Sequence, residues 1–255
     1  MASAGKSFGA PRGHRLHGLL HSSTHAVKGL SWQPVFDRHL RVRGYENSVA
    51  GNAARPSAQE FGDLLALLRN ACHVGRKTSF APAVQFVGID EAALAHPGTR
   101  WNLKETAACL HDCGFALCVH LPAGIAMSAA AADQRVRSLL DLRREGVRVM
   151  LDCPWQPFGN HPVELCRDAC DFVRFDFSAD ARPAPAGEPR EDPDAPPSGT
   201  PAWLRTLASG HLVELVAAGI GTHEQLHQAK ALSFDLYQGP QLLPGIDVWR
   251  APGNG

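Results

Sequence analysis

Short apolar runs alternate with longer amphipathic stretches from about residue 29 to the end of the chain. The apolar runs predict strands at residues 30–37, 41–49, 84–89, 115–121, 147–152, 172–177, 212–217 and 234–237. The amphipathic stretches predict helices at residues 58–73, 102–113, 129–145, 163–170, 203–209 and 222–232. This alternation indicates an α/β fold in which helices cover a parallel sheet.

The number of strands favours a closed (β/α)8 barrel of the TIM type. A doubly wound open sheet is the alternative, but no glycine-rich phosphate loop follows the first strand. Gly114 and Gly146 stand where helix C-terminal caps belong, and Thr222 with Gln225 forms a predicted capping box. The first two strands are separated by a tight turn.

Composition limits the possible partners and the cellular location. Lysine plus arginine and aspartate plus glutamate are equal at 25 each, so no general attraction to DNA or to anionic membranes is expected. No apolar run approaches the ~20 residues of a membrane span, and the first residues lack the apolar core of a secretory signal. Seven cysteines without a CxxC pair indicate reduced thiols in a cytoplasm.

Two segments do not fit the strand and helix pattern. Residues 1–28 predict a flexible arm, in which His14, His17, His21 and His25 form either a metal-binding stripe or, as we favour, a solvated basic face. Residues 180–201 are rich in proline and acidic side chains and predict a disordered surface insertion. The remainder, residues 29–250, is expected to form one barrel domain.

Three stretches in order carry a family resemblance. They are QPVFD with VRGYE (residues 33–37 and 42–46), GVRVMLD (146–152) and AAGIGTHEQLHQAKALSFDLYQG (217–239). They resemble EAL domains, the bacterial cyclic di-GMP phosphodiesterases, and are most similar to the EAL part of EAL–HDOD proteins. The resemblance implies a modified TIM barrel whose first strand is antiparallel. It also implies two magnesium or manganese ions at the C-terminal ends of the strands, which activate water.

Some of the family's functional positions are retained. Glu46 matches a metal-binding glutamate, Asp152 the first of two paired aspartates, and Asp176 the aspartate after the catalytic lysine. Gln238 matches a glutamine near the end of the domain. Together with Gln33, it could meet the edge of a guanine base.

Seven other functional positions are altered. In chain order the family has there a phosphate-binding arginine, a metal-binding asparagine, a glutamate, the second paired aspartate, the catalytic lysine and two glutamates. This chain has Ala50, Gly88, His120, Cys153, Arg174, Ala218 and Gly221. An alternative register sets His120 against the asparagine instead.

These changes imply that the magnesium or manganese site is lost, because such cations need several oxygen ligands. Arg174 cannot release its proton, so it cannot replace a lysine in proton transfer. We therefore expect no catalytic residues, with Glu46, Asp152, Arg174 and Asp176 as vestiges. The predicted function is regulation of cyclic di-GMP signalling through contact with an unidentified bacterial protein. A non-hydrolysing cyclic di-GMP receptor, a residual phosphodiesterase and a homodimer remain alternatives.

Three further patterns allow more than one interpretation. His223, Glu224 and His227 form a formal HExxH zinc motif, but no His or Glu follows to supply a third ligand, so we favour an ordinary helix. A zinc site of His120, Asp152 and Cys153 is a second alternative to simple drift. Trp155, in the loop after the aspartate, could either anchor a partner or pack on the barrel rim.

Overall fold

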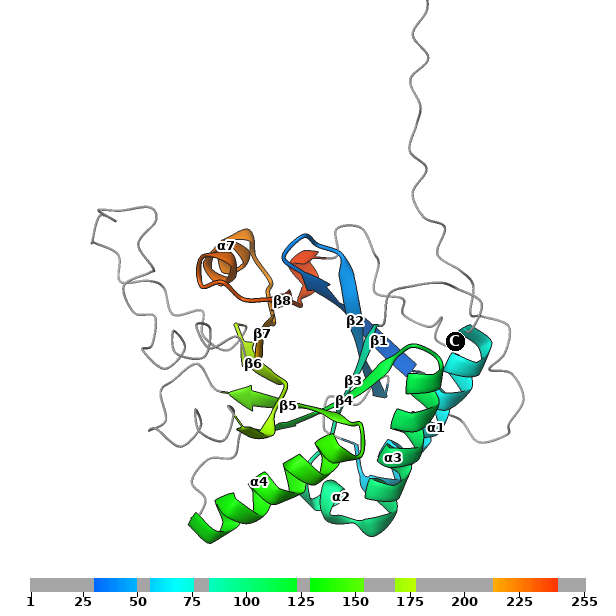
Figure 1. Ribbon diagram of the computed structural model, residues 1–255. Coiled ribbons are helices and arrows are strands. Elements are labelled where there is room, and N and C mark those ends of the chain that lie inside the picture. The colour runs from blue at the N-terminus through cyan, green and yellow to red at the C-terminus, as the bar shows by residue number, and fades with distance from the viewer. Residues whose placement is uncertain are drawn as a thin grey trace, which may run out of the picture.

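A computed structural model of the chain describes residues 30–49, 56–75, 83–122, 129–153, 168–177 and 213–242. Its eight strands close into a barrel in chain order, so the predicted α/β barrel is confirmed and the open sheet is wrong (Figure 1). The first strand runs antiparallel to both of its neighbours, and all other neighbouring strands are parallel. This single reversal is the modification of the TIM barrel that the resemblance implied.

The strands lie within two residues of their predicted positions. They are β1 (Leu30–Asp37), β2 (Val42–Val49), β3 (Val84–Gly88), β4 (Ala116–Pro122), β5 (Arg148–Cys153), β6 (Phe172–Asp176), β7 (Glu214–Ala218) and β8 (Leu236–Tyr237). The last strand is the shortest, and just before it the Asp235 carboxylate accepts a hydrogen bond from the Leu215 amide at 2.9 Å.

The described helices are α1 (Ala58–Gly75), α2 (Glu91–Ala95), α3 (Pro97–Asp112), α4 (Ala129–Arg144) and α7 (His223–Ala231), and a 3-10 turn covers Pro240–Leu242. The predicted start of the helix at residue 102 is wrong. Asp90 and His96 cap two helices in succession, and Pro97 opens the second one in a position where its missing N–H costs nothing. Among these helices, none combines the length and apolarity that crossing a membrane requires.

The helix ends carry the predicted caps. Gly114 and Gly146 adopt φ angles of 82° and 84°, a region that favours glycine, directly after α3 and α4. Thr222 and Gln225 form both hydrogen bonds of the capping box at the start of α7.

Two apolar cores hold the barrel together. The larger one lies between the strands and the surrounding helices, with Phe61 and Leu65 of α1 and Leu103 and Leu110 of α3 fully buried in it. The smaller one fills the inside of the barrel and is called the interior layer below. It consists of Val35, Phe86, Cys118, Met150, Phe172, Val216 and Leu236.

Several predicted features lie outside the described residues. These are the arm at 1–28, the insertion at 180–201, the helix at 203–209, most of the helix at 163–170, and the positions of Ala50 and Trp155.

Candidate functional site

The candidate site lies directly above the interior layer, at the C-terminal ends of the parallel strands. Side chains alternate between the two faces of a strand, so the residue two positions beyond each interior residue also points inward. On β3 to β8 this rule gives one position per strand. On the reversed β1 the position is Gln33, two residues before Val35, and on β2 it is Glu46, the register partner of Gln33. We call these positions the mouth ring: Gln33, Glu46, Gly88, His120, Asp152, Arg174, Ala218 and Gln238. In barrels of this type the ligand face is at this end.

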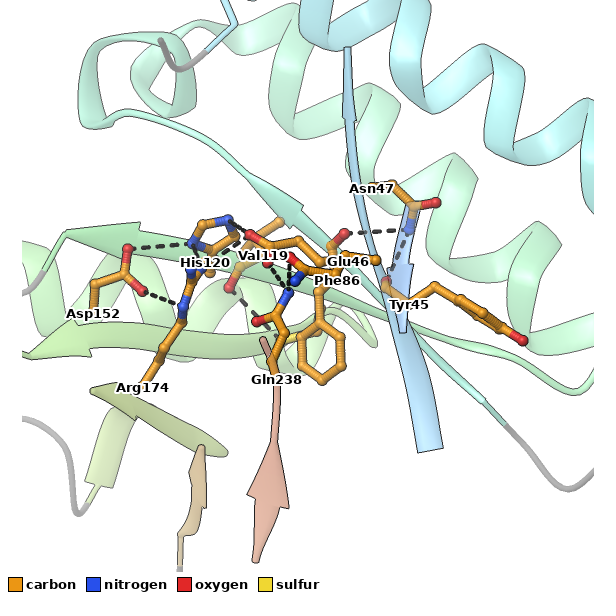
Figure 2. A network of polar contacts seen from close by, with 11 residues as sticks. Tyr45, Glu46, Asn47, Phe86, Val119, His120, Asp152, Arg174 and Gln238 are labelled. Carbon is orange, nitrogen blue, oxygen red and sulfur yellow. Dashed lines mark hydrogen bonds and ion pairs between the residues drawn. The ribbon is translucent and has the colours of Figure 1, made fainter. Parts of the chain in front are cut away.

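Arg174 takes part in the ring's polar contacts (Figure 2). Its guanidinium Nη1 donates to Glu46 Oε1 at 2.9 Å, which joins β6 to β2 across the barrel. Its Nε lies 3.8 Å from Asp152 Oδ1 on the neighbouring strand β5. The Arg174 guanidinium therefore forms ion pairs with both carboxylates of the ring.

His120 bridges the same two carboxylates. Its Nε2 lies 3.2 Å from Glu46 Oε1, and its Nδ1 lies 3.3 Å from Asp152 Oδ2. An imidazole with both nitrogens facing carboxylate oxygens is favoured in its doubly protonated, cationic form. Arg174 Nη1 approaches Nδ1 of this ring to 3.4 Å, and the carboxylates on either side hold the two cations in place.

The His120 ring occupies space that Gly88 leaves open. The two residues are register partners on β3 and β4. A Cβ built on Gly88 would lie 2.6 Å from His120 Nε2, closer than any real contact. The glycine and the histidine are therefore matched, because any side chain at position 88 would displace the imidazole.

Gln238 and Gln33 complete the ring. Gln238 follows β8, is almost fully buried, and its amide nitrogen donates to Gln33 Oε1 at 3.0 Å and also to Glu46 Oε2. Glu46 is thereby held from three sides, by an arginine, a histidine and a glutamine. The Gln238 amide nitrogen, a predicted contact to a guanine edge, is engaged within the protein.

The contacts in the ring shift its acid–base equilibria. Burial alone would raise the pKa of Glu46, but the hydrogen bond with His120 and the charge of Arg174 outweigh burial and lower this pKa from 4.5 to about 2. Burial alone would lower the pKa of His120, whereas its contacts with Asp152 and Glu46 raise it. The pKa of Arg174 is raised by the same two carboxylates, against the effect of burial. The charged forms are thus the stable ones.

The structure brings together five of the six predicted site residues and sets one apart. Gln33, Glu46, Asp152, Arg174 and Gln238 all belong to the mouth ring, whereas Asp176 lies further out, at the exposed end of β6. Its charge still contributes to the raised pKa of Arg174.

The alternative of a zinc site formed by His120, Asp152 and Cys153 is wrong. Asp152 points inward, so its neighbour Cys153 points to the opposite face and is buried in the core between barrel and helices. The alternation of side chains along β5 was available from the sequence and already separates the two residues.

The HExxH residues lie at the surface of α7. His223, Glu224 and His227 are all exposed, and the His223 ring contacts the side chain of Gln241 at 3.0 Å. Across the described part of the chain, no group of three or more His, Cys, Asp and Glu residues is arranged to hold a metal ion.

One buried polar pair was not foreseen. Asn47 follows Glu46 on β2 and therefore faces away from the ring, where its amide donates to Gln85 Oε1 at 3.1 Å and to main-chain carbonyls (Figure 2). Both side chains are buried. Asn47, the residue directly after Glu46, thus joins β2 to β3.

Solved structures with a similar fold are known. No protein-family model matches the sequence, and no curated protein matches it. The structure is similar to Bacillus subtilis YkuI, a protein with an EAL domain in complex with cyclic di-GMP and calcium. The TM-score is 0.56 at 14% identity, over 84% of this chain and 53% of that one. The chain has the fold of EAL domains.

Two isolated EAL domains agree over nearly their whole length. The EAL domain of Mycobacterium smegmatis DcpA gives a TM-score of 0.54 at 20% identity, over 84% of this chain and 90% of that one. The Xanthomonas citri FimX EAL domain, in complex with cyclic di-GMP, gives 0.56 at 14% identity, over 87% and 89%. The chain spans only 53–61% of YkuI and of the Bd1971 structures, which are longer proteins.

The mouth ring does not fit the two magnesium or manganese ions that the resemblance implied. Such ions take about six oxygen ligands each, mainly carboxylates and water. The ring offers the carboxylates of Glu46 and Asp152, and both already contact Arg174 and His120. Gly88 and Ala218 supply no side-chain oxygen at all.

Proposed function

We propose that this chain is a non-hydrolysing EAL-type protein of bacterial cyclic di-GMP signalling that acts in the cytoplasm by contacting another protein. The fold supports the signalling context, since similar structures contain cyclic di-GMP. Fold alone does not determine chemistry, so the rest of the proposal depends on the mouth ring.

The observation that carries the proposal is the ion pair between Arg174 and Glu46, at 2.9 Å. It sets a permanent cation against the carboxylate that would have to hold a metal ion. An arginine at this place also cannot accept or release a proton at neutral pH. The ring therefore lacks both a free metal ligand and a general acid or base on Arg174.

Nucleotide binding without hydrolysis is disfavoured by the two glutamines. Gln33 and Gln238 are bonded to each other, and Gln238 is bonded to Glu46 as well. A guanine edge would have to replace contacts that are already satisfied within the protein, and this lowers the net gain of binding. In addition, the resemblance implies that Ala50 occupies the position of a phosphate-binding arginine. Alanine cannot make the charge-assisted contact with phosphate that an arginine makes.

Titration calorimetry of the full chain with cyclic di-GMP, with and without Mg²⁺, tests this proposal. We expect no saturable heat in either condition. Binding at micromolar concentrations that disappears in Gln238→Ala would replace the proposal with a receptor function. The matched control is Gln241→Ala, an amide change outside the ring, which should leave any binding intact.

A protein partner can be sought by affinity capture with the full chain under the same conditions. The proposal predicts that capture is unaffected by added cyclic di-GMP. Capture that requires the nucleotide would contradict the proposal and would indicate a ligand-controlled adaptor.

A further inference from the structure

The formal charges of the mouth ring balance within the ring itself. Glu46 and Asp152 bring two negative charges, and Arg174 with the protonated form of His120 brings two positive ones. All four side chains are at least two thirds buried, with exposed fractions between 10% and 29%. Buried carboxylates of this kind require a counter-charge, which can be a metal ion or a cationic side chain.

The two cationic side chains lie where a shared counter-ion would have to lie, between the carboxylates. Arg174 contacts one carboxylate from β6 at 2.9 Å and lies 3.8 Å from the other. His120, from β4, contacts both at 3.2 and 3.3 Å. Figure 2 shows the ring with these groups pointing toward one another.

The backbone is also adapted to this arrangement. Gly88 leaves the volume that the imidazole fills, with a hypothetical Cβ only 2.6 Å from its Nε2. His120 is held from both of its nitrogens, so it cannot turn away without losing a carboxylate contact. The arrangement is therefore built into two strands and differs from a surface ion pair, which can open freely.

From these contacts we propose that Arg174 and His120 replace the divalent cations of an EAL-type site, so that the barrel mouth is assembled and neutral without any metal. This inference rests on the proposed function, because it takes the barrel mouth to be non-hydrolytic. A divalent ion entering the ring would meet two cations at contact distance and would have to displace them from their carboxylates. Coulomb repulsion in a partly buried site makes this exchange unfavourable.

The first test uses the protein as it is. Mn²⁺ is titrated into the full chain by calorimetry, and thermal unfolding is followed after dialysis against a chelator and after addition of Mn²⁺. The inference predicts no saturable binding and the same midpoint in both conditions. Saturable binding, or a midpoint that rises by about 5 °C or more with Mn²⁺, would overturn it.

The second test removes the cations. In the double variant Arg174→Gln, His120→Glu, the ring would present three carboxylates and no cation, which is a ligand set suited to Mn²⁺ or Mg²⁺. We expect a lowered midpoint in chelator and a recovery of about 5 °C or more at Mn²⁺ concentrations far above its Kd. A folded double variant that is as stable as the wild type in chelator and ignores Mn²⁺ would contradict the inference.

Two controls separate this result from general effects of charge. Arg144→Gln removes an arginine that pairs with Asp141 at 2.9 Å on the exposed face of α4, and should not create metal binding. His120→Gln keeps Arg174 in the ring and should not create it either. If the double variant fails to fold, the wild-type titration still decides the question.

The outcomes also distinguish this inference from the proposed function. Mn²⁺ binding by the wild type without turnover of cyclic di-GMP would contradict the inference that Arg174 and His120 replace the metal ions. It would leave the proposed non-hydrolysing function intact. Turnover would remove the proposed function.

Discussion

The interior layer and the mouth ring lie two residues apart along seven of the strands, yet they differ in every chemical respect. The interior layer holds apolar side chains only, with Phe86 against Phe172 edge to face at 5.4 Å. The ring above it holds carboxylates, cations and amides joined by directed contacts. The difference shows that the fold and the site depend on different sets of residues.

This separation explains how the fold of EAL domains is kept at 14–20% identity. An apolar layer accepts many residue combinations of similar volume, so it survives extensive substitution. The ring depends on particular functional groups, and replacing them changes the chemistry without opening the barrel. Each prediction below alters one of the two layers.

Truncation in the interior layer should have the largest effect. Phe86 is about 1% exposed, and Phe86→Ala would leave a cavity beside Phe172. We expect a loss of about 4 kcal/mol in the free energy of unfolding, measured by urea denaturation. A loss below about 1 kcal/mol would show that the interior layer does not carry the fold.

Removal of the ring's arginine should cost less. Arg174→Ala leaves Glu46 and Asp152 with His120 as their only partner cation in the ring. We expect a loss of about 2 kcal/mol, because the pairs are partly solvated and not fully buried. Arg144→Ala on α4 is the matched control, with an expected change of at most about 0.5 kcal/mol. Equal losses in the two variants would mean that the ring contacts add nothing.

The match between Gly88 and His120 predicts a coupling between them. Gly88→Ala should cost about 1 kcal/mol, because its Cβ would collide with the imidazole. In a His120→Ala background the same change should be nearly neutral. A double-mutant cycle of unfolding free energies measures this coupling, and strict additivity would argue against the contact.

The dependence of stability on pH should have a particular shape. Glu46 has its pKa lowered from 4.5 to about 2, so its contribution is complete above 4.5 and is lost as the pH falls toward 2. His120 has its pKa raised above 6.5, so its contribution is complete below 6.5 and is lost as the pH rises through the raised value.

The ring's contribution to stability is therefore largest between about pH 4.5 and 6.5. Unfolding free energies measured below, within and above this range should flatten on the acid side in Glu46→Gln and on the alkaline side in His120→Gln. Unchanged profiles in both variants would show that these groups do not titrate with folding.

Much of the fold could be predicted from the sequence because period-two and helical patterns carry it. All eight strands lie within two residues of their predicted ends, and the reversed first strand follows from the resemblance. The short helix α2 was missed because Glu91–Ala95 is too short to show a periodicity. The start of α3 was missed because residues 97–101 are mainly polar, although His96 and Pro97 mark it locally.

The site could be predicted only in part. The resemblance identified which positions had changed, including Gly88, His120 and Arg174. It gave no sign that these changes are coupled to one another. That Gly88 makes room for His120 depends on the register of β3 with β4, and that Arg174 reaches Glu46 depends on closure of the barrel. Neither contact is visible along the chain, since Arg174 and Glu46 lie 128 residues apart.

The central claim is that the barrel mouth no longer hydrolyses cyclic di-GMP. Its most direct test is a time course of cyclic di-GMP with the purified full chain in Mg²⁺ or Mn²⁺, with products separated by chromatography. We predict no linear dinucleotide beyond the level given by the Glu46→Gln variant. Formation of linear dinucleotide by the wild type that is abolished in Glu46→Gln would contradict the account.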